Sequence, residues 1–113
     1  MVKLVAQEVM TALEFQEKPK YIIYLPAGAL DMDEIDEFEA GLVEKFGGFT
    51  RPTAKGGYKN EAGEVEVETV WVYEIITESD EDAKIGEIAA YIKEKGQQEK
   101  VLVEKTTTRC SFI

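Results

Sequence analysis

The segment at residues 64–77, EVEVETVWVYEIIT, constrains the fold more than any other part of the chain. Its odd-numbered positions are apolar or β-branched throughout, whereas its even-numbered positions change from glutamates at 64, 66 and 68 to valines at 70 and 72. Because strand side chains alternate between the two faces of a sheet, the pattern predicts a strand that is apolar on both faces in its second half. We therefore expect this segment in the middle of a sheet.

Two further elements are predicted before it. Residues 2–13 place their apolar side chains in one stripe of a 3.6-residue period, which predicts an amphipathic helix. A strand is the alternative, because Val5, Val9 and Leu13 also share parity. Residues 20–25, KYIIYL, are aromatic and β-branched and are followed by Pro26, so they predict a strand.

Two helices are predicted from their caps and apolar stripes. Asp31 and Glu34 form a capping-box pattern, and the helix that follows is expected to end at Gly47. A second helix, capped by Ser79 or Asp80, is expected to end at Gly96. The buried stripes are expected at Ile35, Phe38, Leu42, Val43 and Phe46 in the first helix, and at Ile85, Ile88, Ala89 and Ile92 in the second.

The remaining segments supply strands and turns. Residues 49–58 contain Pro52 and the Gly56-Gly57 pair, which predict an irregular edge strand. The turn at residues 60–63 then joins it to the central strand as an antiparallel hairpin. Residues 99–104 predict another strand, and the tail 106–113 predicts a turn followed by a short final strand.

The order β, α, β, β, α, β is that of a ferredoxin-like α+β domain, in which two helices pack on one face of an antiparallel sheet. We expect residues 1–113 to form a single domain. It would comprise an N-terminal helix or extension (1–18), the βαββαβ core (20–105) and a C-terminal strand (106–113).

The face of the sheet away from the helices is also expected to be apolar and therefore covered, because monomers rarely leave a large apolar patch in water. The cover is expected to be the N-terminal segment, a second copy of the chain, or both. Two stacked sheets would bury about 800 Å² per partner, as in an ordinary stable interface, so we expect a homodimer of the α+β barrel kind. The side chains expected on this face are Ile22, Val70, Val72, Ile76 and Leu102.

The net charge of −10 argues against a nucleic acid or an anionic membrane as partner, since both require a basic surface. Acidic runs precede both predicted helices, where the helix dipole favours them. An acidic mimic of a nucleic acid, or an inhibitor of a basic protein, is the alternative interpretation. The absence of a long apolar run and of a good signal peptide predicts a cytoplasmic protein, and the single Cys110 agrees with a reducing compartment.

The sequence contains no histidine, which removes the commonest general base and the usual zinc and haem ligand. We therefore expect no metal, no cofactor and no catalytic residue. The aromatic residues Tyr24, Tyr58, Trp71 and Tyr73 are candidates to line a pocket for a small organic ligand, with a core or interface role as the alternative. Glu74 is a candidate for a buried carboxylate, because it interrupts an apolar stretch of one strand face.

Several short motifs resemble those of a group of small uncharacterised bacterial and phage proteins. These are FGGFT at 46–50, the Gly57-Tyr58 pair, TVWVYEI at 69–75, the Gly96-Gln97-Gln98 turn, VLV at 101–103 and the Phe112-Ile113 end. The chain is more broadly similar to dimeric α+β barrel proteins, some of which are cofactor-independent oxygenases or isomerases. The catalytic or haem-binding histidine of some of those proteins has no counterpart here.

The sequence thus favours a small acidic homodimeric binding or structural module without catalysis of its own, related to phage proteins. The alternatives are a small-molecule-binding protein or cofactor-independent enzyme of the dimeric barrel type, and an acidic inhibitor of a basic partner.

Overall fold

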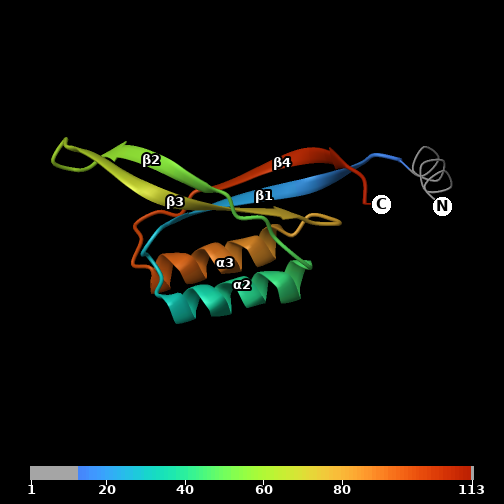
Figure 1. The fold of residues 1–113 in the computed structure, drawn as a ribbon, viewed down its shortest axis with the longest axis horizontal. Helices are drawn as coiled ribbons and strands as arrows, with labels where there is room; N and C mark the ends of the chain where they lie inside the picture. The colour runs from blue at the N-terminus through green and yellow to red at the C-terminus, as the bar shows by residue number, and fades with distance from the viewer. Residues whose placement is uncertain (1–12, 113) are drawn as a thin grey trace, which may run out of the picture.

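The computed structural model describes residues 13–112, and all but the last residue of the helix or strand predicted for residues 2–13 lies outside this range. The described elements alternate in the predicted order (Figure 1). They are β1 (Gln16–Pro26), α2 (Met32–Phe46), β2 (Thr53–Lys59), β3 (Val65–Ile76), α3 (Asp82–Lys95) and β4 (Val103–Cys110).

The strands form one antiparallel sheet with the order β2-β3-β1-β4, and both helices lie on the same side of it (Figure 1). This arrangement confirms the predicted ferredoxin-like α+β fold. The segment at residues 64–77 supplies β3, which lies inside the sheet between β2 and β1, as its pattern predicts.

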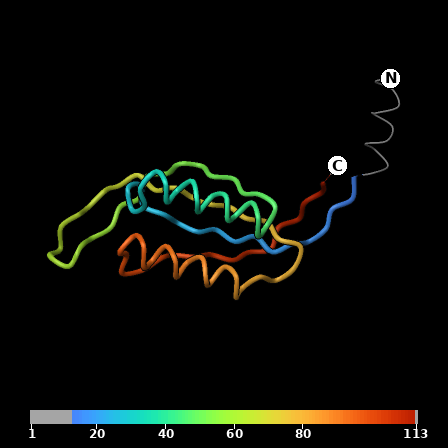
Figure 2. Tube along the Cα trace, turned by 90° about the horizontal axis from the view of Figure 1, so that it is seen from below, coloured from blue at the N-terminus to red at the C-terminus, as the bar shows by residue number. Residues whose placement is uncertain are grey.

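The strands are staggered, so at most three of the four lie side by side at any level of the sheet. β1 pairs with β3 from Val70 to Ile76, whereas residues 65–69 of β3 pair only with β2. At the other end, the first residues of β1 pair only with β4. Two two-stranded arms therefore extend past the helices in opposite directions (Figure 2).

The core lies between the helices and the inner face of the sheet. β1 and β3 contribute alternate residues to this face, and α2 and α3 cover them with most of their predicted stripes. Val43, predicted to be buried in the stripe of α2, is instead 50% exposed. Exclusion of these side chains from water is the main stabilising term of such a layer, at roughly 1.5–3 kcal/mol for each large apolar side chain. The most deeply buried are Tyr21, Ile23, Leu25, Leu42, Tyr73, Ile75 and Ile92.

The ends of α2 follow the predicted capping pattern. The backbone N–H of Glu34 donates to Asp31 Oδ1 at 2.8 Å, and the backbone N–H of Asp31 donates to Glu34 Oε1 at 3.0 Å. Gly47 ends the helix in the left-handed region at φ 87°, where a side chain would be strained.

The cap predicted for α3 is wrong. Neither Ser79 nor Asp80 caps this helix; its N-cap is Glu81, which makes no capping hydrogen bond with its side chain. Instead, the backbone N–H of Glu81 donates to the hydroxyl oxygen of Tyr21 at 2.9 Å. A tyrosine from β1 thus accepts from the N–H of the N-cap residue itself, the donor that the N3 side chain satisfies in a capping box.

Two strand boundaries also differ from those predicted. β1 begins at Gln16 rather than Lys20, and the strand expected at 99–104 and the final strand of the tail are one strand, β4. Both differences have the same cause, because the added residues 16–19 of β1 pair with residues 107–110 of β4, which include Thr107 and Thr108. β-Branched threonines suit a strand when a partner is available, and the partner cannot be identified from their local sequence.

We predict that Asp31→Ala lowers the free energy of unfolding by about 1 kcal/mol, because it leaves the backbone N–H of Glu34 without its acceptor. Urea denaturation monitored by circular dichroism measures the change. The matched control is Asp33→Ala in the same first turn, which should cost less than half as much. Equal losses in both variants would show that helix-dipole charge, rather than the cap, supplies the stability.

Candidate functional site

Both helices lie on one side of the sheet (Figure 1), and the face on the other side is here called the open face. This face is mainly apolar at its centre. Ile22 and Tyr24 of β1 lie beside Val70, Val72 and Ile76 of β3, as the strand register requires. Val72 is 9% exposed, and the other four side chains are partly exposed. Leu102, predicted on the same face, precedes β4 and is 59% exposed. No helix among residues 13–112 covers this face.

Charges are separated along the open face. Glu66 and Glu68 lie on the arm formed by β2 and β3, whereas Lys18 and Lys20 of β1 lie at the opposite end. Because strand side chains alternate between faces, the two glutamates share the face of Val70 and the two lysines share the face of Ile22. The ammonium of Lys18 pairs with Glu78, and its side chain is only 8% exposed. The open face therefore has an acidic end and a basic end, and its mainly apolar centre also contains Glu74 of β3 and Glu104 of β4, which lie on either side of Ile22 in the register.

Two tyrosines on this face bind glutamates. The hydroxyl of Tyr24 donates to Glu104 of β4, and this hydrogen bond is the main cause of the raised pKa of Tyr24. A hydrogen bond to Glu66 likewise raises the pKa of the exposed Tyr58. Both phenols are thus kept protonated as donors, rather than poised to act as bases.

A hollow of about 340 Å³ lies at the basic end of this face, where the loop after α2 reaches the edge of β3. Lys20 and Glu74 bring opposite charges to it, with 3.8 Å between Nζ and Oε2 and about 30% exposure of both side chains. Glu74, predicted to be buried, is thus only partly so. The pair is long for a hydrogen bond, so both groups retain bonding capacity. The other lining residues are Phe46, Gly47, Gly48, Phe49, Thr50, Ile76 and Phe112.

The structure separates the four aromatic residues proposed as a ligand pocket. Tyr24 and Tyr58 lie on the open face, whereas Trp71 and Tyr73 lie on the helix side of the sheet. Tyr73 is fully buried, and its ring meets Phe38 edge-on at 5.0 Å between centroids. None of the four lines the hollow at the basic end of the open face.

Trp71 and Tyr73 instead join α2 to the sheet. The hydroxyl of Tyr73 donates to Glu39 Oε2 at 2.7 Å, and Arg51 Nε lies 3.4 Å from the same oxygen. The guanidinium of Arg51 also stacks over the Trp71 ring at 4.2 Å. Burial and the bond to Glu39 raise the pKa of Tyr73 far above its usual range. This arrangement supports a structural role for both aromatic residues.

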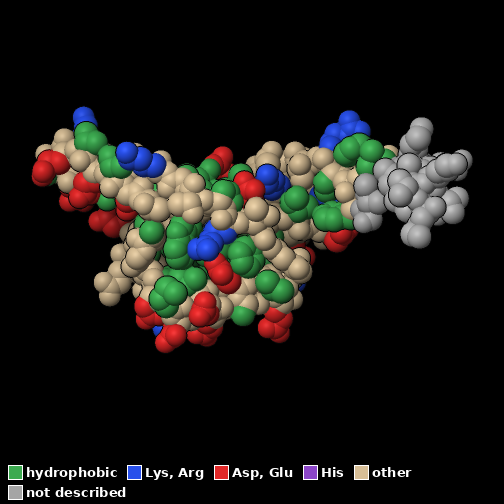
Figure 3. Space-filling view, in the orientation of Figure 1, with side chains coloured by type: hydrophobic (Ala, Val, Ile, Leu, Met, Phe, Trp, Pro, Cys, Tyr) green, Lys and Arg blue, Asp and Glu red, His purple; other side chains and the backbone are tan. Residues whose placement is uncertain are grey.

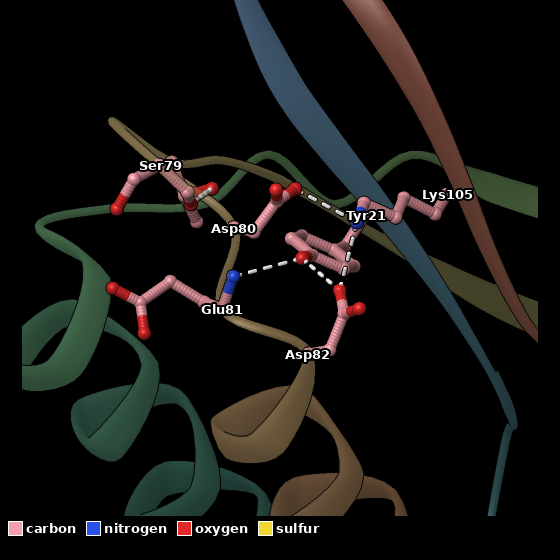
Figure 4. Close-up of polar contacts among 7 residues, drawn as sticks. Tyr21, Ser79, Asp80, Glu81, Asp82 and Lys105 are labelled. Atoms are coloured by element: carbon pink, nitrogen blue, oxygen red, sulfur yellow. Dashed lines mark hydrogen bonds and ion pairs between the residues drawn. The ribbon is translucent and has the colours of Figure 1, made fainter.

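A second polar cluster lies where the loop before α3 meets β1 and β4 (Figure 4). The hydroxyl of Tyr21 donates to Asp82 Oδ1 at 2.5 Å, and Lys105 of β4 contacts Asp80 at 2.7 Å and Asp82 at 2.9 Å. The ammonium of Lys105 lies 5.6 Å from the centre of the Tyr21 ring. The cluster fixes the start of α3 to two strands.

Sequence reasoning missed this cluster, although the acidic run at residues 78–82 was visible. The only available signal was a tyrosine on the core face of β1, whose hydroxyl requires a polar partner when buried. The hydrogen bonds from Tyr21 and Lys105 hold the pKa of Asp82 below its usual value, and the two aspartates raise the pKa of Lys105. Each group is therefore stabilised in its charged form.

Among residues 13–112, no group of three or more His, Cys, Asp or Glu side chains has an arrangement suited to a metal ion. The helices in this part of the chain are also too short or too polar to cross a membrane. Cys110 is partly buried near the end of β4.

We predict that Tyr21→Phe lowers the free energy of unfolding at pH 7 by about 1 kcal/mol, because the backbone N–H of Glu81 loses its acceptor. The deficit should shrink on acidification. The lowered pKa of Asp82 stabilises the fold above about pH 4, and this contribution is lost as the pH falls through the folded-state pKa.

Urea titrations between pH 2 and 7 measure both effects. Tyr24→Phe is the matched control, since its hydrogen bond to Glu104 is exposed, and it should change stability by less than about 0.5 kcal/mol. A constant deficit for Tyr21→Phe across this pH range would contradict the assigned role of Asp82.

No protein-family model and no curated protein matches this chain. Among solved structures, its fold is similar to that of a phage SAM lyase in the apo state, with a TM-score of 0.51 and 14% sequence identity. The similarity covers 87% of this chain and 90% of the lyase. It agrees with the α+β architecture described above, and at this identity it establishes the fold alone.

Proposed function

We propose that the protein is a non-catalytic homodimeric binding module whose two copies associate through their open faces. The observation that carries the proposal is the row of partly exposed apolar side chains at the centre of the sheet, which no helix in residues 13–112 covers. A second copy would exclude this row from water on both molecules at once, as in a standard-size interface. The apolar centre is formed by Ile22, Tyr24, Val70, Val72 and Ile76.

The charge pattern of the open face favours a second copy of the same chain. The two copies could be related by a two-fold axis that lies in the interface plane, runs perpendicular to the strands and passes through Val72. The strands of the partner would then run in the opposite direction. Glu68 lies four residues before Val72 and Ile76 four residues after it, so each is displaced by about 13 Å. The acidic arm of one copy would then lie over Lys20 and Ile76 of the other, Val72 would meet Val72, and Val70 would lie over Glu74.

We predict that Val70→Glu converts the dimer to a monomer, because two carboxylates would enter the apolar centre of the interface. Light scattering during gel filtration at about 10 µM measures the mass. Val67→Glu is the matched control: it introduces the same charge on the opposite side of the same strand, at a position that is 56% exposed, and should leave the dimer intact. A monomeric wild-type protein would overturn the proposal.

The proposed two-fold arrangement has its own test within this experiment. Glu68→Lys and Lys20→Glu should each weaken the dimer, and the double variant should restore it, because the charges exchange places across the interface. If the double variant is weakened by the sum of the two single effects, the dimer proposal stands but this orientation of the two copies is excluded.

A second candidate function is binding of S-adenosylmethionine or a similar zwitterion by a small phage-related protein. The likeness to a phage SAM lyase and the chemistry of the edge hollow favour it. Lys20 and Glu74 suit the carboxylate and ammonium of an amino acid group, and the phenylalanines at 46, 49 and 112 suit an apolar or flat body. The volume of about 340 Å³ is within the usual range of ligand pockets.

Calorimetric titration with S-adenosylmethionine tests this candidate. Binding should occur in the wild type and fall at least about tenfold in Glu74→Gln, which removes the partner of the ligand's ammonium. Asp33→Asn, on the exposed side of α2, is the control and should bind normally. Absence of binding at millimolar ligand would exclude this function. If chromatography shows that the protein consumes the ligand, the protein is an enzyme rather than a non-catalytic module.

A further inference from the structure

The outer side of the helix layer contains a groove that the dimer does not use. It lies between α2 and α3, has a volume of about 170 Å³, and faces away from the sheet. Its apolar floor is formed by Phe38 and Leu42 of α2 with Ile88 and Tyr91 of α3. The rings of Phe38 and Tyr91 lie parallel, with their centres 6.4 Å apart. Phe38 is only 6% exposed, so the partly exposed Tyr91 supplies most of the accessible aromatic surface.

Gly41 lies in the middle of α2 and lines this groove, and packing within the described chain does not explain why this residue is glycine. A β-carbon added there would meet no atom within 4 Å, so no close contact within the described chain requires glycine. Glycine in a helix interior is destabilising relative to alanine, because it loses more conformational freedom on folding. The missing side chain keeps the groove deep and allows another molecule to approach the backbone of α2.

The surroundings of the groove are strongly negative. Residues 31–46 carry seven acidic side chains and one basic, a net charge of −6 out of −10 for the whole chain. Glu37 and Glu87 line the groove, and Lys45 is the basic residue in its lining. Figure 3 shows acidic side chains along the outer edge of the helix layer, with apolar side chains between them.

The negative charge affects the pKa of Tyr91. Burial raises the pKa of its hydroxyl, and the charges of Glu37, Glu34 and Asp31 raise it further. These acids lie toward the N-terminal end of α2, whereas Lys45 lies in its last turn. The groove therefore has a negative end beside Tyr91, where a cation would be attracted both by the carboxylates and by the ring face.

We propose that this groove binds a basic amphipathic helix of another protein. Its apolar residues would enter the groove over Phe38 and Tyr91, and its Lys or Arg residues would pair with the acids at the negative end. This is the helix-in-groove mode of recognition, in which spaced apolar anchors give affinity and charges give specificity. Gly41 is a positioning residue, because it permits the close approach.

The test uses a synthetic 18-residue peptide of Leu and Lys that forms one apolar helical face, labelled for fluorescence anisotropy at about 150 mM salt. A peptide of the same composition, with its order permuted to remove the apolar face, controls for charge alone. The full-length protein should bind the amphipathic peptide at least about tenfold more tightly than the permuted peptide.

Gly41→Ala should weaken binding of the amphipathic peptide about fivefold or more, by filling the groove. Gly86→Ala is the matched control, because Gly86 is also helical with open space around it but does not line the groove. It should bind normally. Both variants should melt at higher temperature than the wild type, so a loss of binding in Gly41→Ala cannot come from unfolding.

The proposal is overturned if the two peptides bind equally, since the acids alone would then explain the affinity. Wild-type affinity in Gly41→Ala, or no binding of the amphipathic peptide at 100 µM, would also overturn it. Oligomeric state is measured separately, and because the groove and the open face are on opposite sides of the sheet, failure of either proposal leaves the other intact.

Discussion

The antiparallel pairing of β1 with β3 is the interaction on which the rest of the structure depends. It joins residues 20–26 to residues 70–76, and both helices pack over these same residues. Apart from Lys20 and Glu74, each strand is apolar on both faces here, so the pair can be buried on one side and still present a mainly apolar surface on the other. Without this pairing, the two arms would no longer belong to one sheet and the helices would lose the surface on which they pack.

The position of this pairing explains the change in β3 at residue 70. Before it, β3 has β2 as its single strand partner and projects past the helices, so its sheet faces meet solvent and carry Glu66 and Glu68. After it, β1 joins and the open face becomes mainly apolar, with Glu74 as the exception. The change therefore marks where a two-stranded arm gains a third strand, and this boundary also separates the acidic end of the open face from its mainly apolar centre.

The elements that were predicted correctly have local causes. A few neighbouring residues are enough to predict the capping box at Asp31, the helix end at the left-handed Gly47 and the alternation in β3. The errors have distant causes: the start of β1 depends on threonines some 90 residues away, and the start of α3 depends on the hydroxyl of Tyr21. The apolar residues of the open face followed from strand parity, whereas the edge hollow and the helix groove require the tertiary arrangement of several segments.

The distribution of charge gives the two sides of the molecule different recognition chemistry. The open face carries both signs at opposite ends, which is a self-complementary pattern and suits a copy of the same chain. The helix layer has one dominant sign, because α2 with its cap holds most of the net charge. Two such layers would repel each other, so the partner proposed there is basic and different from this chain. The proposed self-association and the proposed binding of another protein would thus use opposite sides of the fold, since like charge would exclude a second copy from one side and apolar complementarity would admit it on the other.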